Sequence, residues 1–525
     1  MTEISDGNVP ESNETVKYTS ASALYPERKP DMRQSGILLH ITSLPSPEGI
    51  GTLGREARAF ADFLARSGMR VWQVLPVSPT GYAESPYQCF STYAGNPLLI
   101  DLRTLQKQGI LSTGEKYPSS ANTEIADYAP VIRFKNQMLA LAFEQSWGKL
   151  AGKVKKFRRD NALWIEDYAL FMAIKQHFGG ISWQDWPDND IRMRKPKALR
   201  WYRERLAAQI DRQAFIQYLF FEQWFALKRY ANKKGISIFG DMPIYVAEDS
   251  ADAWANPAVF QLDETRRPTR IAGVPPDYFS ADGQRWGNPL YNWAYLKKTG
   301  YRWWLDRFSA MGRIYDITRV DHFIGFANYY SVPADELTAR NGIWMNGPGK
   351  PLFEAVKRAL PDIHIVAEDL GAVSPKVRKL MAYTGYPGMK VMTFAFSGDP
   401  FNEHLPKYHE KNSVVYTGTH DNNTLLGWWE NASQLEKNTA ILALGIRHKE
   451  DLTEAFLRAT LKSRSDTAII PMQDILRLPE AARMNLPGTL GGNWLWRMKP
   501  GAATAQIAKW LRGLNEEAGR VPAGK

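Results

Sequence analysis

The sequence predicts an α/β fold, a (β/α)8 barrel with large insertions, and two observations support this prediction. Short apolar runs recur eight times, and amphipathic, helix-like segments separate most of them. Alternation of strands and helices is typical of a parallel sheet, and eight such units indicate a sheet that closes into a barrel. The eight runs are Gly36–His40, Val71–Pro76, Ile236–Met242, Tyr315–His322, Ile363–Leu370, Met389–Phe396, Val414–Asp421 and Ala468–Ile475.

The helix-like segments repeat their apolar residues with the period of a helix that packs one face on a sheet. The clearest of them are Leu53–Arg66, Gln213–Asn232, Trp303–Met311 and Ser374–Tyr383. After the eighth run, Leu478–Lys525 leaves room for a loop and a closing helix at Thr504–Leu514. We therefore expect no C-terminal β-sandwich.

Two connections are longer than ordinary loops. Residues 78–211 contain helical periods, so we expect a mostly helical subdomain inserted after the second strand. Residues 245–292 are rich in Gly, Pro and aromatic residues, and we expect a loop region whose part at 273–289 is neither helix nor strand. Residues 1–34 are predicted to be a polar extension, and residues 35–525 a single barrel domain that includes both insertions.

The composition narrows the class of protein. A hydrophobic content of 44% suffices for a sizeable core. Cys89 is the single cysteine, which excludes an intramolecular disulfide and a cysteine zinc site and favours a reducing compartment. The polar N-terminus lacks the pattern of a secretory signal, and no apolar run reaches the roughly 18 residues of a membrane span. We expect a cytoplasmic protein without a membrane partner.

The formal charge of +11 raises nucleic-acid binding as an alternative. The basic residues are spread along the chain, however, and the densest run, Lys153–Arg159, fits the polar side of a helix. A solvated basic surface with no nucleic-acid partner is therefore expected. The 18 tryptophans are a hint in another direction, because their faces stack on sugars as well as fill cores.

Acidic residues end four of the predicted strands: Asp241, Asp321, Glu368 (followed by Asp369) and Asp421. The C-terminal ends of barrel strands meet at one mouth, where barrel enzymes build their active sites. A lone carboxylate after an apolar run is usually a helix cap or a surface ion pair. Four like charges at one mouth are costly unless function maintains them, so the cluster indicates a catalytic site.

Glycosyl transfer is the chemistry that needs such carboxylates. One attacks the anomeric carbon while a second, kept protonated, gives its proton to the leaving oxygen, and retaining enzymes hold the two about 5 Å apart. Arg319 lies two residues before Asp321 on the same strand face, where it would keep Asp321 ionised; a simple structural ion pair is the alternative. A metal site using His322 and His420 is the main rival, although neither histidine belongs to an H-x-x-x-H pair.

Several sequence blocks carry a specific resemblance, which runs from about Gly36 to Arg497. The sequence resembles the amylomaltase, or 4-alpha-glucanotransferase, family (glycoside hydrolase family 77 of the alpha-amylase superfamily), called disproportionating enzyme in plants. The blocks are Leu38-Leu-His-Ile-Thr-Ser-Leu-Pro, Trp72-Gln-Val-Leu-Pro, Ser85-Pro-Tyr-Gln, Ala94-Gly-Asn-Pro, Gly240-Asp-Met-Pro-Ile-Tyr-Val-Ala, Gly273-Val-Pro-Pro-Asp-Tyr-Phe-Ser, Gly283-Gln-Arg-Trp-Gly-Asn-Pro and Thr417-Gly-Thr-His-Asp-Asn.

The resemblance implies a role for each site residue. Asp321 would be the nucleophile, Glu368 the general acid and then base, and Asp421 the transition-state stabiliser. Arg319 would orient the nucleophile. The other implied substrate-binding residues are Tyr87, Asp241, His322 and His420 around the donor sugar, Gln284 and Trp286 on the acceptor side, and Asn493 at the cleft. Taken without the resemblance, Tyr87 could equally be a core residue, the segment with Gln284 and Trp286 an ordinary surface loop, and Asn493 a turn residue.

The predicted function is transfer of an α-1,4-glucan segment to the 4-hydroxyl of an acceptor glucose or maltooligosaccharide, with room for cyclic products, by a retaining double displacement. No cofactor and no metal, calcium included, is expected. A hydrolase of the same superfamily would use the same carboxylates and is the main alternative. A non-catalytic glucan-binding protein would have lost one of the three, and all are present.

The sequence departs from the common family pattern at three positions. Ile324 stands where many members have Arg, Asn423 where many have Asp, and Ile41 where Pro is common. None of them removes a predicted catalytic group. We expect Ile324 to alter the donor-side cleft or the acceptor preference.

Overall fold

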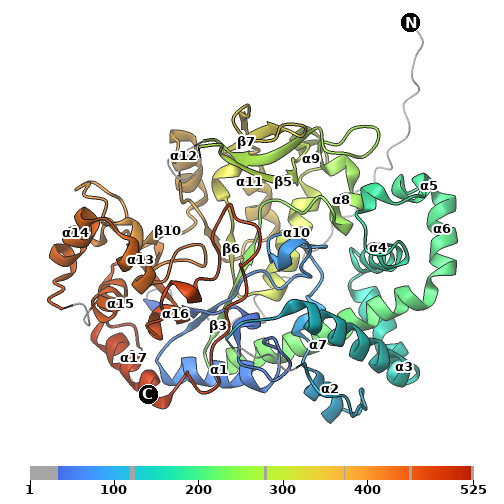
Figure 1. Cartoon of the computed structure of the whole chain (residues 1–525). Coiled ribbons are helices and arrows are strands. Elements are labelled where there is room, and N and C mark those ends of the chain that lie inside the picture. Colours follow the sequence, from blue (N-terminus) through green and yellow to red (C-terminus); the bar gives the residue numbers. More distant parts are fainter. Residues whose placement is uncertain (1–32, 119–123, 277–280, 372, 449–451, 522–525) are drawn as a thin grey trace, which may run out of the picture.

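The computed structural model describes residues 33–118, 124–276, 281–371, 373–448 and 452–521 (Figure 1). Most of the predicted polar extension lies outside these residues. At the centre stand eight strands, whose neighbours pair in parallel. These strands are β1 (Gln34–Leu38), β2 (Val71–Gln73), β3 (Ser237–Met242), β6 (Ile317–Val320), β9 (Ile365–Ala367), β10 (Gly388–Val391), β11 (Ser413–Tyr416) and β12 (Thr467–Pro471).

The strands follow each other around the barrel in chain order, with β12 pairing back to β1. The ring is nearly closed: at the seam between β9 and β10, strand pairing gives way to two separate hydrogen bonds. The N–H of Ala367 donates to the Pro387 carbonyl at 2.9 Å, and the N–H of Met389 donates to Asp369 Oδ1 at 2.7 Å. The predicted eight-stranded barrel is confirmed, and each of the eight predicted runs overlaps one of its strands.

Helices surround the barrel, and α17 packs on α1 and α15 to complete the layer near the C-terminus (Figure 1). The connection from β10 to β11 has only the 3-10 turns η8 (Met392–Phe394) and η9 (Pro406–Tyr408) in place of an α-helix. The helices of the layer and of its loops are α1 (Arg55–Arg66), α7 (Ala207–Lys233), α8 (Ala251–Ala255), α9 (Trp293–Lys298), α10 (Arg302–Ile314), α11 (Lys350–Ala359), α12 (Pro375–Thr384), α13 (Leu425–Asn431), α14 (Gln434–Leu444), α15 (Leu452–Lys462), α16 (Met472–Ile475) and α17 (Ala505–Glu517).

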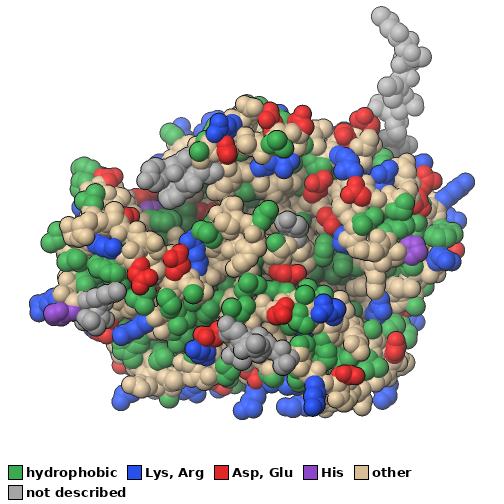
Figure 2. Space-filling view, in the orientation of Figure 1, with side chains coloured by type: hydrophobic (Ala, Val, Ile, Leu, Met, Phe, Trp, Pro, Cys, Tyr) green, Lys and Arg blue, Asp and Glu red, His purple; other side chains and the backbone are tan. Residues whose placement is uncertain are grey.

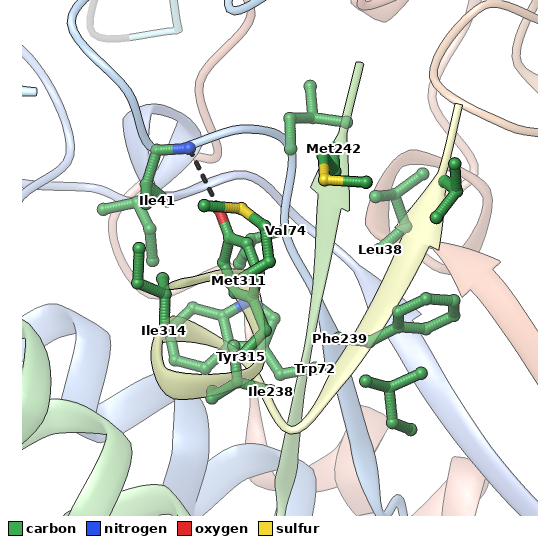
Figure 3. Packing of buried hydrophobic residues seen from close by; sticks show 14 of the residues in the cluster. Leu38, Ile41, Trp72, Val74, Ile238, Phe239, Met242, Met311, Ile314 and Tyr315 are labelled. Carbon is green, nitrogen blue, oxygen red and sulfur yellow. Dashed lines mark hydrogen bonds between the residues drawn. The ribbon is translucent and has the colours of Figure 1, made fainter. Parts of the chain in front are cut away.

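The core lies between the barrel strands and their helices. Figure 3 shows Trp72 of β2 and Ile238 of β3 beside Met311 and Ile314 of α10. Trp72 is fully buried, and its indole N–H donates to the Leu39 carbonyl at 2.8 Å, which satisfies the one polar group of the side chain.

The first insertion is mostly helical, as predicted, and its helices α4, α5 and α6 stand to the right of the barrel in Figure 1. The expected boundary at residue 211 falls inside α7, which packs against α3, α4 and α6 as well as β3 and so connects the insertion to the barrel. The helices of the insertion are α2 (Leu102–Lys107), α3 (Tyr128–Asp160), α4 (Ile165–His177), α5 (Asn189–Arg192) and α6 (Pro196–Arg205).

The second insertion differs from the expectation. The prediction that residues 273–289 are neither helix nor strand was wrong, because parts of this segment belong to an antiparallel sheet in the order β5-β4-β7-β8. Within the segment β4 pairs with β5, and β4 also pairs with β7, which comes from beyond β6. A stretch so rich in Gly and Pro shows no clear strand pattern. The strands are β4 (Arg270–Val274), β5 (Gln284–Pro289), β7 (Asn328–Pro333) and β8 (Ile343–Asn346).

Positive and negative side chains are interspersed on the surface. On the face shown in Figure 2, Lys and Arg side chains are scattered among Asp and Glu side chains. Among the helices of the described residues, none is long and apolar enough to cross a membrane.

Gly240 in β3 is predicted to be essential for packing. A Cβ at this position would lie 2.1 Å from Cγ of the Tyr315 ring, which is itself buried. We expect Gly240→Ala to lower the free energy of unfolding by about 1–3 kcal/mol or more, as overpacked cores do, in a denaturant titration. Gly513 in α17 is the matched control, because its Cβ would meet open space; equal losses in both variants would contradict the prediction.

Candidate active site

A buried arginine joins two carboxylates at the mouth of the barrel. Arg319 of β6 donates from Nη1 to both oxygens of Asp241 at 2.8 and 2.7 Å, and its Nη2 lies 2.7 Å from Asp321 Oδ1. Asp241 is the residue opposite Arg319 in the pairing of β3 with β6. Burial disfavours the charge of Arg319, but the two carboxylates hold its pKa above the ordinary value. The guanidinium therefore fixes the direction of the Asp321 carboxylate.

The phenol of Tyr87 connects this group to a histidine. Tyr87 lies between β2 and α2, and its hydroxyl is 2.8 Å from Asp241 Oδ2 and 2.8 Å from His420 Nε2. The phenol donates to Asp241, and its oxygen also contacts the His420 ring nitrogen. The two rings stack with their centroids 5.3 Å apart. Tyr87 thus belongs to the polar network of the mouth.

Glu368 follows β9 in a buried position. Its Oε2 accepts from the backbone N–H of His322 at 2.7 Å, and its Oε1 accepts from the N–H of Leu370 at 2.7 Å. Burial raises the pKa of Glu368 from 4.5 to about 8, against the opposing effect of Arg319 and with the help of the negative charge of Asp321. Glu368 is therefore mostly protonated at neutral pH, whereas Asp321 contacts a cation.

His322 has an unusual backbone conformation with φ of +48°, in the left-handed region. For a residue other than glycine this costs about 1–3 kcal/mol, and such strain collects at functional sites. Its N–H points at Glu368, and its ring meets Trp286 of β5 edge to face at a centroid distance of 4.9 Å. Burial lowers the pKa of His322 to about 4, so the ring is neutral. Gln284 accepts from the Trp286 indole N–H at 3.2 Å.

Asp421 lies in the loop after β11, where two side chains from beyond α16 hold it. Asn485 donates from Nδ2 to Asp421 Oδ1 at 2.7 Å, and Arg483 donates from Nη2 to the Asp421 carbonyl at 2.6 Å. His420 Nε2 is 3.4 Å from the same Oδ1. A chain of contacts thus connects Asp321, through Arg319, Asp241, Tyr87 and His420, to Asp421.

Asn485→Ala tests whether the orientation of Asp421 matters. Loss of a hydrogen bond to a charged group costs about 1.5–3 kcal/mol, so we expect kcat to fall by about 10- to 100-fold with little change in thermal stability. Steady-state kinetics with a maltooligosaccharide would measure the effect. Asn412→Ala is the control, because this exposed asparagine bonds to the Gly385 carbonyl away from the site; the same loss of kcat there would refute the prediction.

Comparison with known proteins identifies the family of this chain. Residues 39–504 match the family described as 4-alpha-glucanotransferase. The 4-alpha-glucanotransferase of Streptococcus pneumoniae is 46% identical over 489 residues, which cover 92% of this chain and 96% of that protein. The chain belongs to this family. The 4-alpha-glucanotransferase of Thermus thermophilus is 45% identical over 501 residues, covering 93% and 99% of the two chains.

Solved structures agree with the family. The amylomaltase from Streptococcus agalactiae in complex with acarbose matches with a TM-score of 0.91 at 41% identity, covering 93% of this chain and all of that chain. The amylomaltase from Corynebacterium glutamicum, at 18% identity and a TM-score of 0.71, shares the fold. The predicted 4-alpha-glucanotransferase activity is confirmed, and transfer is favoured over hydrolysis.

The remaining predicted residues of this 4-alpha-glucanotransferase have mostly local partners. Asn493 bonds within its own loop, accepting from the N–H of Leu486 at 2.9 Å and donating to Thr489 Oγ1 at 3.1 Å. Ile324 is buried in the main core, and Asn423 accepts from the N–H of Thr424 at 2.9 Å.

Several residues that hold the candidate site together carry no signal in the sequence. Arg483 and Asn485 follow no apolar run, so no strand-end signal marks them. Trp494 packs near both Tyr87 and His420, at centroid distances of 5.8 and 6.0 Å, and its neighbours in Gly-Gly-Asn-Trp were the only hint.

Proposed function

We propose that this 4-alpha-glucanotransferase moves a segment of an α-1,4-glucan to the 4-hydroxyl of an acceptor glucose or maltooligosaccharide by a retaining double displacement. The observation that carries the proposal is the contrast between two carboxyl groups. Asp321 contacts the guanidinium of Arg319, whereas burial raises the pKa of Glu368 to about 8. Environments that differ in this way divide the roles of nucleophile and acid between two carboxyl groups.

In the first step, Asp321 attacks the anomeric carbon of the donor sugar. A bond forms between that carbon and a carboxylate oxygen, and the bond to the glycosidic oxygen breaks. Glu368 gives its proton to the departing oxygen, which leaves as the 4-hydroxyl of the released fragment. The glucan is then an ester of Asp321, and Glu368 is a carboxylate.

In the second step, the Glu368 carboxylate takes the proton of the acceptor 4-hydroxyl. The acceptor oxygen attacks the anomeric carbon, the ester bond breaks, and Asp321 is released. The two inversions give net retention of configuration. Both groups return to their starting protonation states, so the cycle needs no external proton donor.

The other residues of the mouth bind and orient in this proposal. Asp421 would grip hydroxyls of the sugar ring as it flattens, and Tyr87 would stack beneath the donor sugar. Trp286 lies beside His322, where it would shield the ester from water and contact an acceptor. The acarbose bound by the Streptococcus agalactiae relative supports a glucan-like ligand.

The lone buried Cys89 suits a reducing compartment, and we place the reaction in the cytoplasm.

Incubation with maltotriose tests the proposed function. We expect free glucose and a ladder of longer maltooligosaccharides at a constant total of reducing ends, with a new α-1,4 bond by NMR. Rising reducing ends without longer products would contradict transfer, and products of β configuration would contradict retention.

A further inference from the structure

The loop that carries Asp421 comprises residues 417–425, from the residue after β11 to the first residue of α13, and is called the Asp421 loop below. It contains both His420 and Asp421. On one side it borders a cavity of about 20 Å³, the scale of one water molecule, lined by His40, Thr419, Gln473 and Asp474 among others. On this side, hydrogen bonds add to the packing of the buried loop ends.

A buried aspartate binds both ends of this loop. Asp474 lies in the short helix α16 after β12 and is 3% exposed. Its Oδ2 accepts from the Thr417 hydroxyl at 2.6 Å, and its Oδ1 accepts from the N–H of Leu425 at 2.8 Å. Thr417 is the first residue of the Asp421 loop, and Leu425 is the first residue of α13. One carboxylate therefore fixes the separation of the two loop ends.

The middle of the loop is held from another direction. Asn485 and Arg483 bond the side chain and the carbonyl of Asp421. Asn422 accepts from both the N–H and the hydroxyl of Thr419, at 2.8 and 2.9 Å, which shapes the turn from within. The ends are thus held by Asp474 from one side, and Asp421 would shift if these ends moved relative to β11.

We propose that Asp474 is a positioning residue that holds the ends of the Asp421 loop and so places the Asp421 carboxylate for glucan transfer. The inference rests on the proposed function, in which Asp421 stabilises the transition state. Burial raises the pKa of Asp474 to about 6, which is still below neutral pH. The side chain is therefore mostly a carboxylate there, and both of its oxygens accept hydrogen bonds. A displacement of about 1 Å at a catalytic group can cost about 100-fold in rate.

Asp474→Ala is the central variant. We expect kcat for maltotriose disproportionation to fall by roughly 10- to 100-fold while KM changes less than about threefold, because placement of Asp421 matters most in the transition state. Asp474→Asn should restore most of kcat, since its amide oxygen can accept from Leu425 and its amide nitrogen can donate to the Thr417 hydroxyl. Thr417→Val removes one of the two bonds and should give an intermediate loss, even if Asp474→Ala folds poorly.

Asp316→Ala is the matched control. Asp316 is also buried and accepts from the N–H of Ile238 at 2.7 Å, but it lies before β6, at the opposite end of the barrel. The Asp316→Ala substitution should lower the melting temperature without a selective loss of kcat. The inference is overturned if Asp474→Ala keeps kcat within about twofold, or if Asp316→Ala lowers kcat equally. Asp421→Ala, measured in parallel, distinguishes a failure of this inference from a failure of the proposed function. Full activity of Asp421→Ala would overturn the proposed function itself.

Discussion

Replacement of Asp321 by Asn is expected to reduce glucan transfer by about ten-thousand-fold or more, the scale seen when a catalytic nucleophile is removed. Asn keeps the size of the side chain but cannot form the ester. Arg319 retains its bonds to Asp241, so the mouth should keep its shape. The measurement is kcat on maltotriose, with the melting temperature as a check on folding.

A trapping experiment distinguishes the nucleophile from a merely structural carboxylate. A glycosyl fluoride donor with a second fluorine on the reacting sugar slows release of the ester, so mass spectrometry of the protein should show one added sugar. After digestion the label should lie on the peptide that contains Asp321 and be missing in Asp321→Asn. Asp316→Asn, at the opposite end of β6, should label normally. A label on another carboxylate would refute the assignment.

The second large effect is expected at Glu368. Glu368→Gln removes the proton that the leaving oxygen needs, so kcat on maltotriose should fall by about 100- to 10,000-fold. A glycosyl fluoride needs no such proton and should still load the enzyme. Azide, which attacks without being deprotonated, should then rescue turnover and give a product of retained configuration. Failure of azide rescue, with the fluoride still consumed by the native enzyme, would argue against the general acid and base role.

The pH profile tests the same residue. Glu368 must be protonated in the free enzyme for the first step, and burial raises its pKa from 4.5 to about 8. The protonated form therefore predominates below this pH, and kcat/KM should fall as the pH rises through about 8. With a glycosyl fluoride donor, this fall in kcat/KM at high pH should disappear. A fall in kcat/KM that persisted unchanged with the fluoride would report the titration of a residue other than Glu368.

The barrel could be predicted because its information is local. Each strand is a short apolar run, and each of Asp241, Asp321, Glu368 and Asp421 ends one of these runs. Parallel strands of a barrel place their C-terminal ends at one mouth, so the fold alone brings such residues together.

The supports of the site could not be predicted in the same way. Asn485 contacts Asp421 across 64 residues, and nothing near Asn485 in the sequence points to that contact. The sheet that contains β4 and β5 takes its other two strands from beyond β6, so half of its pairing leaves no signal in this segment. The left-handed backbone of His322 is likewise set by the surrounding fold, since only a few per cent of residues other than glycine adopt it.

The seam between β9 and β10 gives the barrel something that a fully hydrogen-bonded ring lacks, namely two strand edges. A buried backbone N–H at such an edge is costly unless another group accepts its hydrogen bond. Here the carboxylate of Asp369 occupies the N–H of Met389, and a Cβ on Gly388 would collide with it at 2.5 Å. The Asp369 side chain thus satisfies a backbone group that the missing pairing of β9 with β10 leaves over, directly beside Glu368, the proposed general acid.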